Sequence, residues 1–176
     1  YNITSNFGLT GEINFLQQYR HLEAYSGKTL PYYNHRPFIL GRAGIFYNSS
    51  FVNLVSAFTY ARRTNDYSRL TVMSDNPNED PVMVGALSGI ETMGWTTDAM
   101  FTPFKGFTFH AMVTLQSPKY TGYKFEAFNK NYDFSGKTVT KQSKIIVELD
   151  PNYTFDRFNI WASFRYYGKQ YANVGN

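Results

Sequence analysis

Three stretches of this chain share one design, in which a short turn is followed by about nine residues that alternate between apolar and polar side chains. Equivalent apolar positions are held by Val52, Phe107 and Phe158, by Leu54, Phe109 and Ile160, and by Phe58, Val113 and Phe164. A period of two residues indicates a β-strand with one apolar face and one polar face. Strands of roughly 9–11 residues, repeated in this way, are typical of a membrane-spanning β-barrel.

The composition is compatible with such a barrel. Hydrophobic residues make up 43% of the 176 residues and the mean hydropathy is −0.40. The sequence has no run of about 18 apolar residues, which excludes a transmembrane helix. It does not exclude a barrel, because alternation hides the apolar half of each strand. Aromatic residues reach 19%, with 15 Tyr and 16 Phe, and they favour strands and the aromatic girdles of outer-membrane barrels.

Several function classes are disfavoured by the residue types. The absence of cysteine excludes disulfides, thiol catalysis, thiolate zinc sites and iron–sulfur clusters. The net charge of +4 comes from dispersed basic residues, so nucleic-acid binding has little support. The sequence shows no nucleophile elbow, Ser-His-Asp order or phosphate-binding glycine loop. We therefore expect no enzymatic activity and no cofactor.

The alternation predicts seven strands and no helix. The strands are expected at about residues 3–17, 38–47, 51–63, 87–102, 106–117, 142–155 and 157–168. Short connections at 48–50, at 103–106 and around Asp156 alternate with long ones at 18–37, 64–86 and 118–141. Bacterial outer-membrane barrels have short periplasmic turns and long extracellular loops, so this alternation favours a barrel. Pro151 lies within the sixth segment and predicts a bulge or a strand end there.

The polar face of the predicted strands has charged residues near the middle of several strands, namely Glu12, Arg42, Asp98, Lys144, Glu148 and Arg165. This face would be the hydrated lumen of a barrel or the solvent face of a soluble β-sandwich. In the barrel, Phe107, Phe109, Val113, Phe158, Ile160 and Phe164 face lipid, whereas in the sandwich they pack together across two sheets. The alternative function is a soluble carbohydrate-binding sandwich that uses loop aromatics. Seven strands do not close the usual barrel, which has an even number, so we expect further strands before Tyr1 and after Asn176.

Two regions resemble the barrels of TonB-dependent receptors. Residues 94–107 (GWTTDAMFTPFKGF) resemble a strand, a proline-containing turn and the next strand, and residues 146–171 are similar to a late hairpin of these barrels. The resemblance implies an antiparallel, up-and-down transmembrane β-barrel of 22 strands in the bacterial outer membrane. Residues 1–176 would be part of that one barrel domain, with about seven of its strands. The N-terminal plug domain and the final strands would lie outside this sequence.

The resemblance also implies a function and partners. Such receptors import a scarce nutrient, such as a glycan, an iron chelate or a vitamin. The expected partners are the lipid bilayer of the outer membrane, the TonB complex through the missing N-terminal part, a surface lipoprotein, and a small-molecule or oligosaccharide ligand.

Aromatic residues in the predicted long loops are the candidate ligand-binding residues, because aromatic rings can stack on sugar rings or flat chelates. They are Tyr32, Tyr33 and His35 before the second strand, and Tyr120, Tyr123 and Tyr132 between the fifth and sixth. The alternative is that they pack the loops together. Metal binding by His21, Glu23 and His35, or calcium binding by residues 75–80, is less favoured, since neither has a recognised ligand spacing. We therefore predict no metal site, and we expect His110 to be a lumen residue without a catalytic role.

Overall fold

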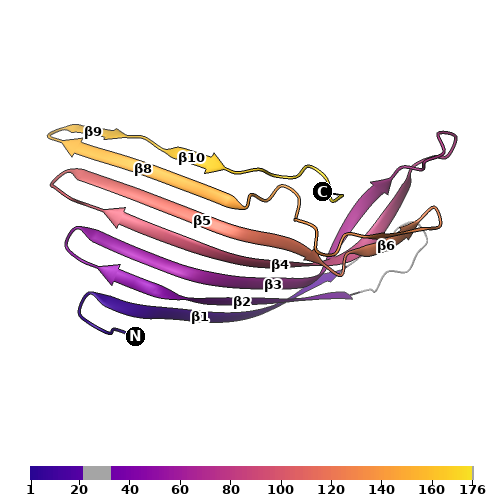
Figure 1. The fold of residues 1–176 in the computed structure, drawn as a ribbon, viewed down its shortest axis with the longest axis horizontal. Helices are drawn as coiled ribbons and strands as arrows, with labels where there is room; N and C mark the ends of the chain where they lie inside the picture. The colour runs from indigo at the N-terminus through magenta and orange to yellow at the C-terminus, as the bar shows by residue number, and fades with distance from the viewer. Residues whose placement is uncertain (22–32, 176) are drawn as a thin grey trace.

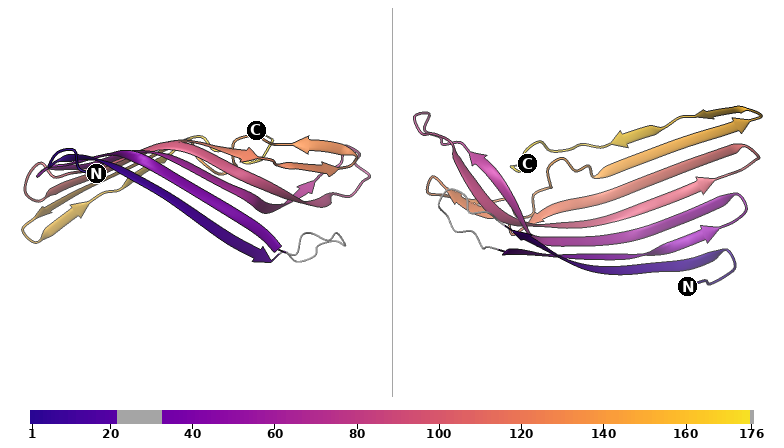
Figure 2. Two further views of the ribbon diagram at one scale, coloured as in Figure 1. Left: turned by 90° about the horizontal axis from the view of Figure 1, so that it is seen from below. Right: turned by 180° about the vertical axis from the view of Figure 1, so that it is seen from behind.

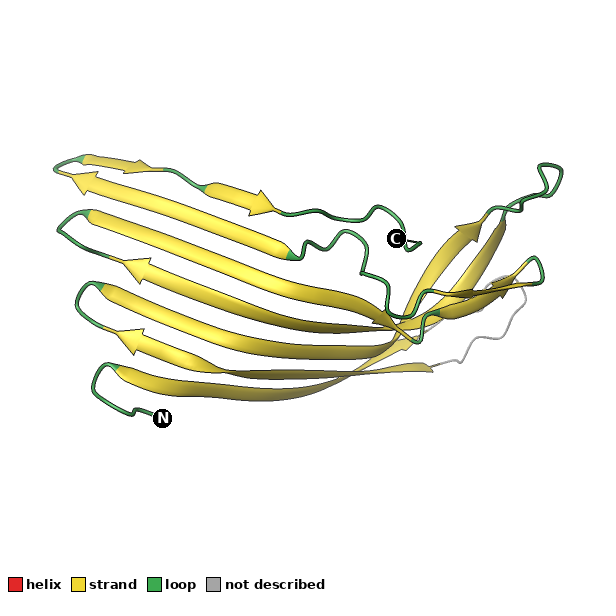
Figure 3. Ribbon diagram, in the orientation of Figure 1, coloured by secondary structure: helices red, strands yellow, loops and turns green. Residues whose placement is uncertain are grey.

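The computed structural model describes residues 1–21 and 33–175, with side chains described for residues 1–17 and 37–175. The described residues form strands and loops and contain no helix (Figure 3). They make one eight-stranded antiparallel sheet and a separate two-stranded sheet. The predicted all-β, antiparallel architecture is therefore confirmed.

The strands of the large sheet follow one another along the chain and across the sheet. In chain order the strands are β1 (Phe7–His21), β2 (Tyr33–Asn48), β3 (Val52–Val72), β4 (Val82–Phe101), β5 (Phe107–Thr121), β6 (Lys124–Ala127), β7 (Lys130–Asp133), β8 (Ile145–Phe155), β9 (Phe158–Trp161) and β10 (Phe164–Tyr167). The order across the large sheet is β1-β2-β3-β4-β5-β8-β10, and β9 also pairs with β8. The sheet is a single curved and twisted layer (Figures 1 and 2). The short β6–β7 hairpin lies at one end of it, beside the extended ends of β3 and β4 (Figure 2).

Three short turns lie at the same end of the sheet, on the left in Figure 1. They join β2 to β3, β4 to β5 and β8 to β9. Gly106 in the second turn has a φ of +86°, and a Cβ atom there would lie 2.3 Å from the carbonyl oxygen of Thr154. The Gly106 carbonyl accepts a hydrogen bond from the Thr154 amide at 2.8 Å. Only glycine fits this turn without strain, because it has no Cβ and tolerates a positive φ.

At the opposite end, β3 and β4 extend well beyond the strands predicted from the alternation. The long loop expected at 64–86 is wrong, since β3 continues to Val72 and β4 begins at Val82. The register between the two strands shifts between Arg63 and Asp66, which marks a β-bulge, and Asn65 within it has a φ of 57°. An extra residue moves the following side chains to the other face, so the period of two is lost at this point. The loop expected at 118–141 likewise contains strand, in the β6–β7 hairpin.

Pro151 interrupts the neighbouring strand rather than its own. Strand β8 runs through Pro151 in continuous register with β5. The Pro151 carbonyl accepts a hydrogen bond from the Ala162 amide at 3.0 Å, and at this place the seventh predicted strand is divided into β9 and β10. In an antiparallel pair the N–H and C=O of one residue point to the same neighbour. The missing N–H of proline therefore removes a hydrogen bond on the side of Ala162, and the break appears there.

The buried core of the described residues lies at the loop end, not in the middle of the sheet. It consists of Ala86, Tyr120, Tyr123 and Val139, with Leu70, Ile90, Phe125, Phe134 and Val174 packed against it. On one side of the sheet β9 and β10 pair only with β8, and on the other side the outer edge of β1 bonds only to Tyr1 and Asn2, at Gly8 and Leu9. Within the described residues the sheet is therefore open at both edges.

Candidate functional site

One face of the large sheet is apolar across all seven strand positions. Residues that lie directly opposite each other in an antiparallel pair project from the same face, so the register identifies its members. We call them the apolar band: Phe7, Leu9, Ile13 and Phe15 of β1; Ile39, Ala43, Ile45 and Tyr47 of β2; Val52, Leu54, Phe58 and Tyr60 of β3; Met93, Trp95, Ala99 and Phe101 of β4; Phe107, Phe109, Ala111, Val113 and Leu115 of β5; Ile145, Val147, Leu149, Tyr153 and Phe155 of β8; and Phe158, Ile160, Phe164 and Tyr166 of β9 and β10.

Many side chains of the apolar band are exposed. Ile13 and Ile160, on the strands at the two opposite edges, are each 70% exposed. Val113 in the interior strand β5 is also 39% exposed, so the exposure is not confined to the edges. The positions interspersed in the band on the same face are Gly11, Gly41, Ser56, Thr97, Pro151 and Ala162. The charged residues Arg62, opposite Ile39, and Glu91, opposite Arg62, lie at its loop-side limit. No second layer of the described residues covers this surface, which is the arrangement expected of a lipid-facing sheet.

The polar atoms inside the apolar band are bonded to one another. The hydroxyls of Ser56 and Thr97 lie 2.7 Å apart, and the indole nitrogen of Trp95 donates to the Ser56 hydroxyl at 2.9 Å. Such mutual bonding removes the cost of placing these groups in an apolar medium. At the loop-side limit of the band, the Tyr60 hydroxyl donates to the carboxylate of Glu91 at 3.1 Å. A tyrosine with an apolar ring and a hydrogen-bonded hydroxyl suits a membrane–water interface.

The opposite face is polar, as the alternation predicts. The predicted residues Glu12 and Arg42 lie directly opposite each other in the β1–β2 register. The guanidinium of Arg165 lies 3.8 Å from the carboxylate of Glu148. Lys144 immediately precedes β8.

His110 lies between two carboxylates of the polar face. Its Nε2 is 3.1 Å from Asp98 Oδ2, and its Nδ1 is 3.2 Å from Asp150 Oδ2. The three residues belong to β5, β4 and β8, so the imidazole connects three adjacent strands. No group of three or more metal-binding side chains that could hold a metal ion occurs in the described part of the chain. The imidazole of His110 therefore links three adjacent strands through its two ring nitrogens.

Tyr120, Tyr123 and Tyr132, three of the candidate binding residues, lie together in one aromatic cluster at the loop end. Ring centroids of Tyr120 and Tyr123 are 5.0 Å apart, and the ring of Tyr132 stacks on Phe125 at 5.1 Å. Tyr120 is 8% exposed and Tyr123 is 2% exposed, so their rings pack the loops and do not offer a free face. Burial raises the pKa of Tyr123, whose hydroxyl oxygen accepts a hydrogen bond from the Ser68 hydroxyl at 2.9 Å. Tyr132 is half-buried and is the most accessible of the three.

The second group of candidates is described only in part. Tyr32 lies outside the described residues, as does Glu23 of the weaker metal hypothesis. The backbones of Tyr33 and His35 belong to β2 and lie opposite His21 and Tyr19 of β1. Their side chains are outside the description, and the proposed ligand role of these residues stays a prediction.

The acidic loop at 75–80 has protein partners of its own. The carboxylate of Asp75 pairs with the ammonium group of Lys130, which joins the tip of the β3–β4 hairpin to that of the β6–β7 hairpin. The carboxylate of Glu79 accepts a hydrogen bond from Ser74 within the loop. The carboxylates of Asp75 and Glu79 thus bond to other protein groups in this exposed loop.

The β6–β7 hairpin is itself held by a charged group. Asp133 accepts hydrogen bonds from Ser135 and pairs with Lys124 at 2.9 Å. The hydrogen bonds from Ser135 and then the contact with Lys124 lower the pKa of Asp133 from 3.8 to about 2.

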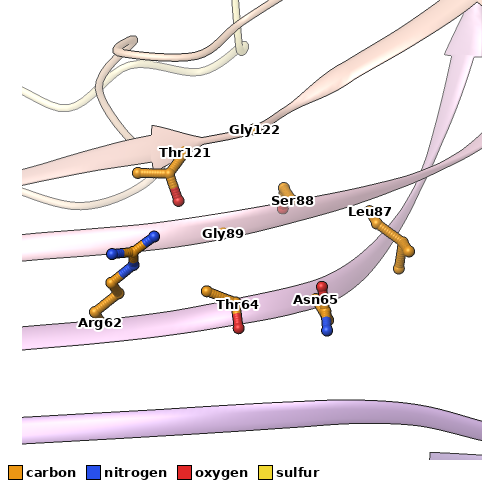
Figure 4. A pocket seen from close by; sticks show the side chains of 8 residues that line it. All are labelled: Arg62, Thr64, Asn65, Leu87, Ser88, Gly89, Thr121 and Gly122. Atoms are coloured by element: carbon orange, nitrogen blue, oxygen red, sulfur yellow. The ribbon is translucent and has the colours of Figure 1, made fainter.

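A pocket of about 250 Å³ lies beside the bulge that the alternation does not predict (Figure 4). It is lined by residues of β3, of β4 and of the end of β5 with the residue that follows it: Arg62, Thr64, Asn65, Leu87, Ser88, Gly89, Thr121 and Gly122. A Cβ atom at Gly89 would lie 2.1 Å from the Thr121 hydroxyl, so glycine allows β4 and β5 to approach here. The available sequence signal was the run Thr64-Asn65-Asp66, in which three polar residues break the alternation.

Comparison with protein families, with curated proteins and with solved structures gives no significant match for this chain. The described residues contain no helix that is long and apolar enough to cross a membrane.

Proposed function

We propose that this chain is a sector of a transmembrane β-barrel in the bacterial outer membrane. The observation that carries the proposal is the apolar band, which is uncharged and exposed from β1 to β10. Soluble monomers rarely expose contiguous apolar patches larger than a few hundred Å². A soluble β-sandwich would cover this face with a second sheet.

The dimensions of the apolar band support the same proposal. On β1, β2, β3, β4 and β5 it extends over about nine residues per strand. About nine residues of strand span about 27 Å, and a tilt of about 40° reduces this to about 21 Å along the membrane normal. The apolar belt of outer-membrane barrels is about 25 Å tall. The two open edges would then pair with further strands, because unpaired backbone groups are costly in lipid.

Within this class we propose that the complete protein is a 22-stranded TonB-dependent receptor that imports a scarce nutrient. Support comes from the likeness of residues 94–107 and 146–171 to such barrels. In the structure these residues form β4 with β5, and β8 with β9 and β10. The ligand would be a glycan, an iron chelate or a vitamin, and the TonB complex would act through the N-terminal part of the receptor.

Single-cysteine labelling tests the membrane arrangement. Because residues 1–176 contain no cysteine, an introduced cysteine is the only thiol in this part of the protein. We would introduce Ser135→Cys in the loop region, Lys105→Cys in a short turn and Val113→Cys in the apolar band, each in the full-length protein. A membrane-impermeant maleimide should label position 135 in intact cells and position 105 only after the outer membrane is permeabilised. Position 113 should stay unlabelled in both cases. Equal labelling of all three in a soluble fraction would contradict the barrel and favour the sandwich.

Transport is tested separately, with uptake of a ferric chelate, vitamin B12 and an oligosaccharide. Deletion of the gene should abolish uptake of one of these compounds, and loss of TonB should abolish the same uptake. Unchanged uptake of all members of a broad panel would refute the transport proposal while leaving the barrel intact.

A further inference from the structure

On the polar face, both ring nitrogens of His110 lie within hydrogen-bond distance of a carboxylate, Nε2 at 3.1 Å from Asp98 Oδ2 and Nδ1 at 3.2 Å from Asp150 Oδ2. We call these three residues the His110 group. An ionised carboxylate only accepts hydrogen bonds, and a neutral imidazole has one N–H and one unprotonated nitrogen. A neutral ring can therefore donate to one of the two carboxylates, whereas the imidazolium ion donates to both. A protonated carboxyl that donates to a neutral ring would hold the same number of protons, so this geometry requires one extra proton in the group.

The His110 group spans three neighbouring strands at the level of the apolar band, but on the opposite face. His110 lies directly opposite Asp150 of β8, and Asp98 of β4 lies opposite Met112, two residues along β5 from His110. The ring thus reaches straight across to one strand and diagonally to the other. The His110 side chain is 26% exposed, so water on the polar face can take up and return the proton.

Few other charges face the His110 group from the described strands around it. Strand β8 contributes Glu148, and β10 contributes Arg165, whose guanidinium lies 3.8 Å from the Glu148 carboxylate and also acts on Asp150. The Ser163 side chain hydrogen-bonds to Asp150 as well. When His110 loses its proton, Arg165 is the one cation left among these groups, against three carboxylates. The neighbouring polar-face positions of β3, β4, β5 and β9 are uncharged: Asn53, Val55, Met100, Thr108, Met112 and Trp161.

Loss of the extra proton changes the side-chain bonding but not the backbone of the sheet. The N–H bond of the imidazolium breaks, its electron pair stays on the nitrogen, and the proton passes to water. That nitrogen then presents a lone pair to a carboxylate oxygen at 3.1 or 3.2 Å, which is repulsive, so the carboxylate turns away. The pairing of β5 with β4 and β8 is continuous through His110 and does not involve the ring. One of the two cross-strand links is released while the strands stay paired.

We propose that His110 is a proton-operated clamp, which ties Asp98 and Asp150 to β5 while the group holds its extra proton and releases one carboxylate when that proton is lost. Proton loss also makes this part of the polar face more negative by one charge. Cations are then attracted to it, and the side chains that link β4, β5 and β8 become more mobile. The clamp does not depend on the proposed membrane location, because the polar face is wet in a barrel lumen and in a soluble sandwich alike.

Solution NMR of the full-length protein in detergent micelles tests the clamp, with ¹⁵N-labelled histidine and ¹³C-labelled aspartate. The signals of the His110 ring are identified by their loss in His110→Gln. At the acidic end of the range in which histidine titrates, between about pH 5 and 8, both ring nitrogens should carry a proton. As the pH rises, one nitrogen should lose its proton, and the carboxyl signal of one partner, Asp98 or Asp150, should shift in step with it.

The variant Asp98→Asn separates the clamp from a simple titration. An asparagine amide can donate to an unprotonated Nε2, so a neutral ring can keep both contacts in this variant. The carboxyl signal of Asp150 should then stay constant while the ring titrates.

Hydrogen exchange gives a second readout. In the wild type, the protection of the amides of residues 108–112 relative to their intrinsic exchange rates should fall by about three- to tenfold as the ring loses its proton. His110→Gln has no titrating ring and should show no such step.

Three results would overturn the clamp: a single protonated ring nitrogen at the acidic end, a ring that stays doubly protonated up to the highest pH at which the protein is folded, or the same step in protection in His110→Gln. Heat-modifiable gel mobility of each variant shows whether the barrel is folded. A folded, detergent-dependent barrel with any of these results refutes the clamp alone. A protein that folds in buffer without detergent contradicts the proposed barrel, and the same NMR experiment then tests the clamp in buffer.

Discussion

Placing an arginine in the apolar band tests whether this face meets lipid. On β5 the band runs from Phe107 to Leu115, so its midpoint is Ala111. Val113 lies two residues away from Ala111, which is about 7 Å along the strand. With the strand tilted by about 40°, Val113 lies about 5 Å from a membrane midplane at Ala111. Arginine on the lipid face costs about 2–4 kcal/mol at the midplane and less near the interfaces. We expect Val113→Arg to lower the free energy of unfolding by about 2–3 kcal/mol, or about 30- to 150-fold in the folding equilibrium.

The matched control is Met112→Arg, one residue away on the polar face. Met112 lies directly opposite Asp98 in β4 and Glu148 in β8, so an arginine there gains acidic neighbours. We expect a change of less than about 0.5 kcal/mol. The measurement is urea unfolding of the full-length protein from phosphatidylcholine vesicles, followed by tryptophan fluorescence.

The difference between the two variants shows whether the apolar band faces lipid or water. If the apolar band faced water instead of lipid, an arginine at the 39% exposed position 113 would hardly change the free energy of unfolding. Both variants would then change stability by similar small amounts. Equal effects of Val113→Arg and Met112→Arg would refute the assignment of the apolar band to lipid.

Three further predictions concern the turns and the loop end. Gly106→Ala should destabilise the protein by at least about 1 kcal/mol more than Gly136→Ala, because both glycines have a positive φ but only Gly106 faces a backbone oxygen at 2.3 Å; equal melting temperatures would contradict this. Tyr123→Phe removes the hydroxyl contact with Ser68 and should cost about 1 kcal/mol, seen as faster hydrogen exchange in β6 and β7; unchanged protection would show that the contact is not stabilising. The pKa of Asp133 is depressed to about 2, so its contribution is present above about pH 4 and is lost as the pH falls toward 2; the protection of the β7 amides relative to their intrinsic exchange rates should fall over that range in the wild type and not in Asp133→Asn.

The sequence predicted the strands of the sheet better than their ends. Strict alternation located a strand at each of the seven expected places, and the three short turns lie at one end as expected. It failed at residues 64–86, because the bulge at Asn65 changes which face each later residue occupies. It also placed the effect of Pro151 in β8, whereas the lost donor falls on the side of Ala162.

The candidate site was predicted less completely than the fold. Sequence alone marked the loop aromatics, but the burial of Tyr123 depends on contacts with Ser68 and Phe134, which come from two other segments. Only the structure shows that the segments around residues 143 and 168 meet, because the Ser143 hydroxyl donates to the Gly168 carbonyl at 3.0 Å.

The sequence by itself determined that this chain forms antiparallel strands with one apolar face and one polar face. That information is local, since a side chain's face follows from its position along its own strand. The tertiary structure decided how those faces combine. The register aligned the apolar residues of the strands into one exposed band and left both edges of the sheet open within the described residues. Contacts between distant segments also formed the aromatic cluster at the loop end. Such relations depend on pairing between distant segments, which no local period specifies.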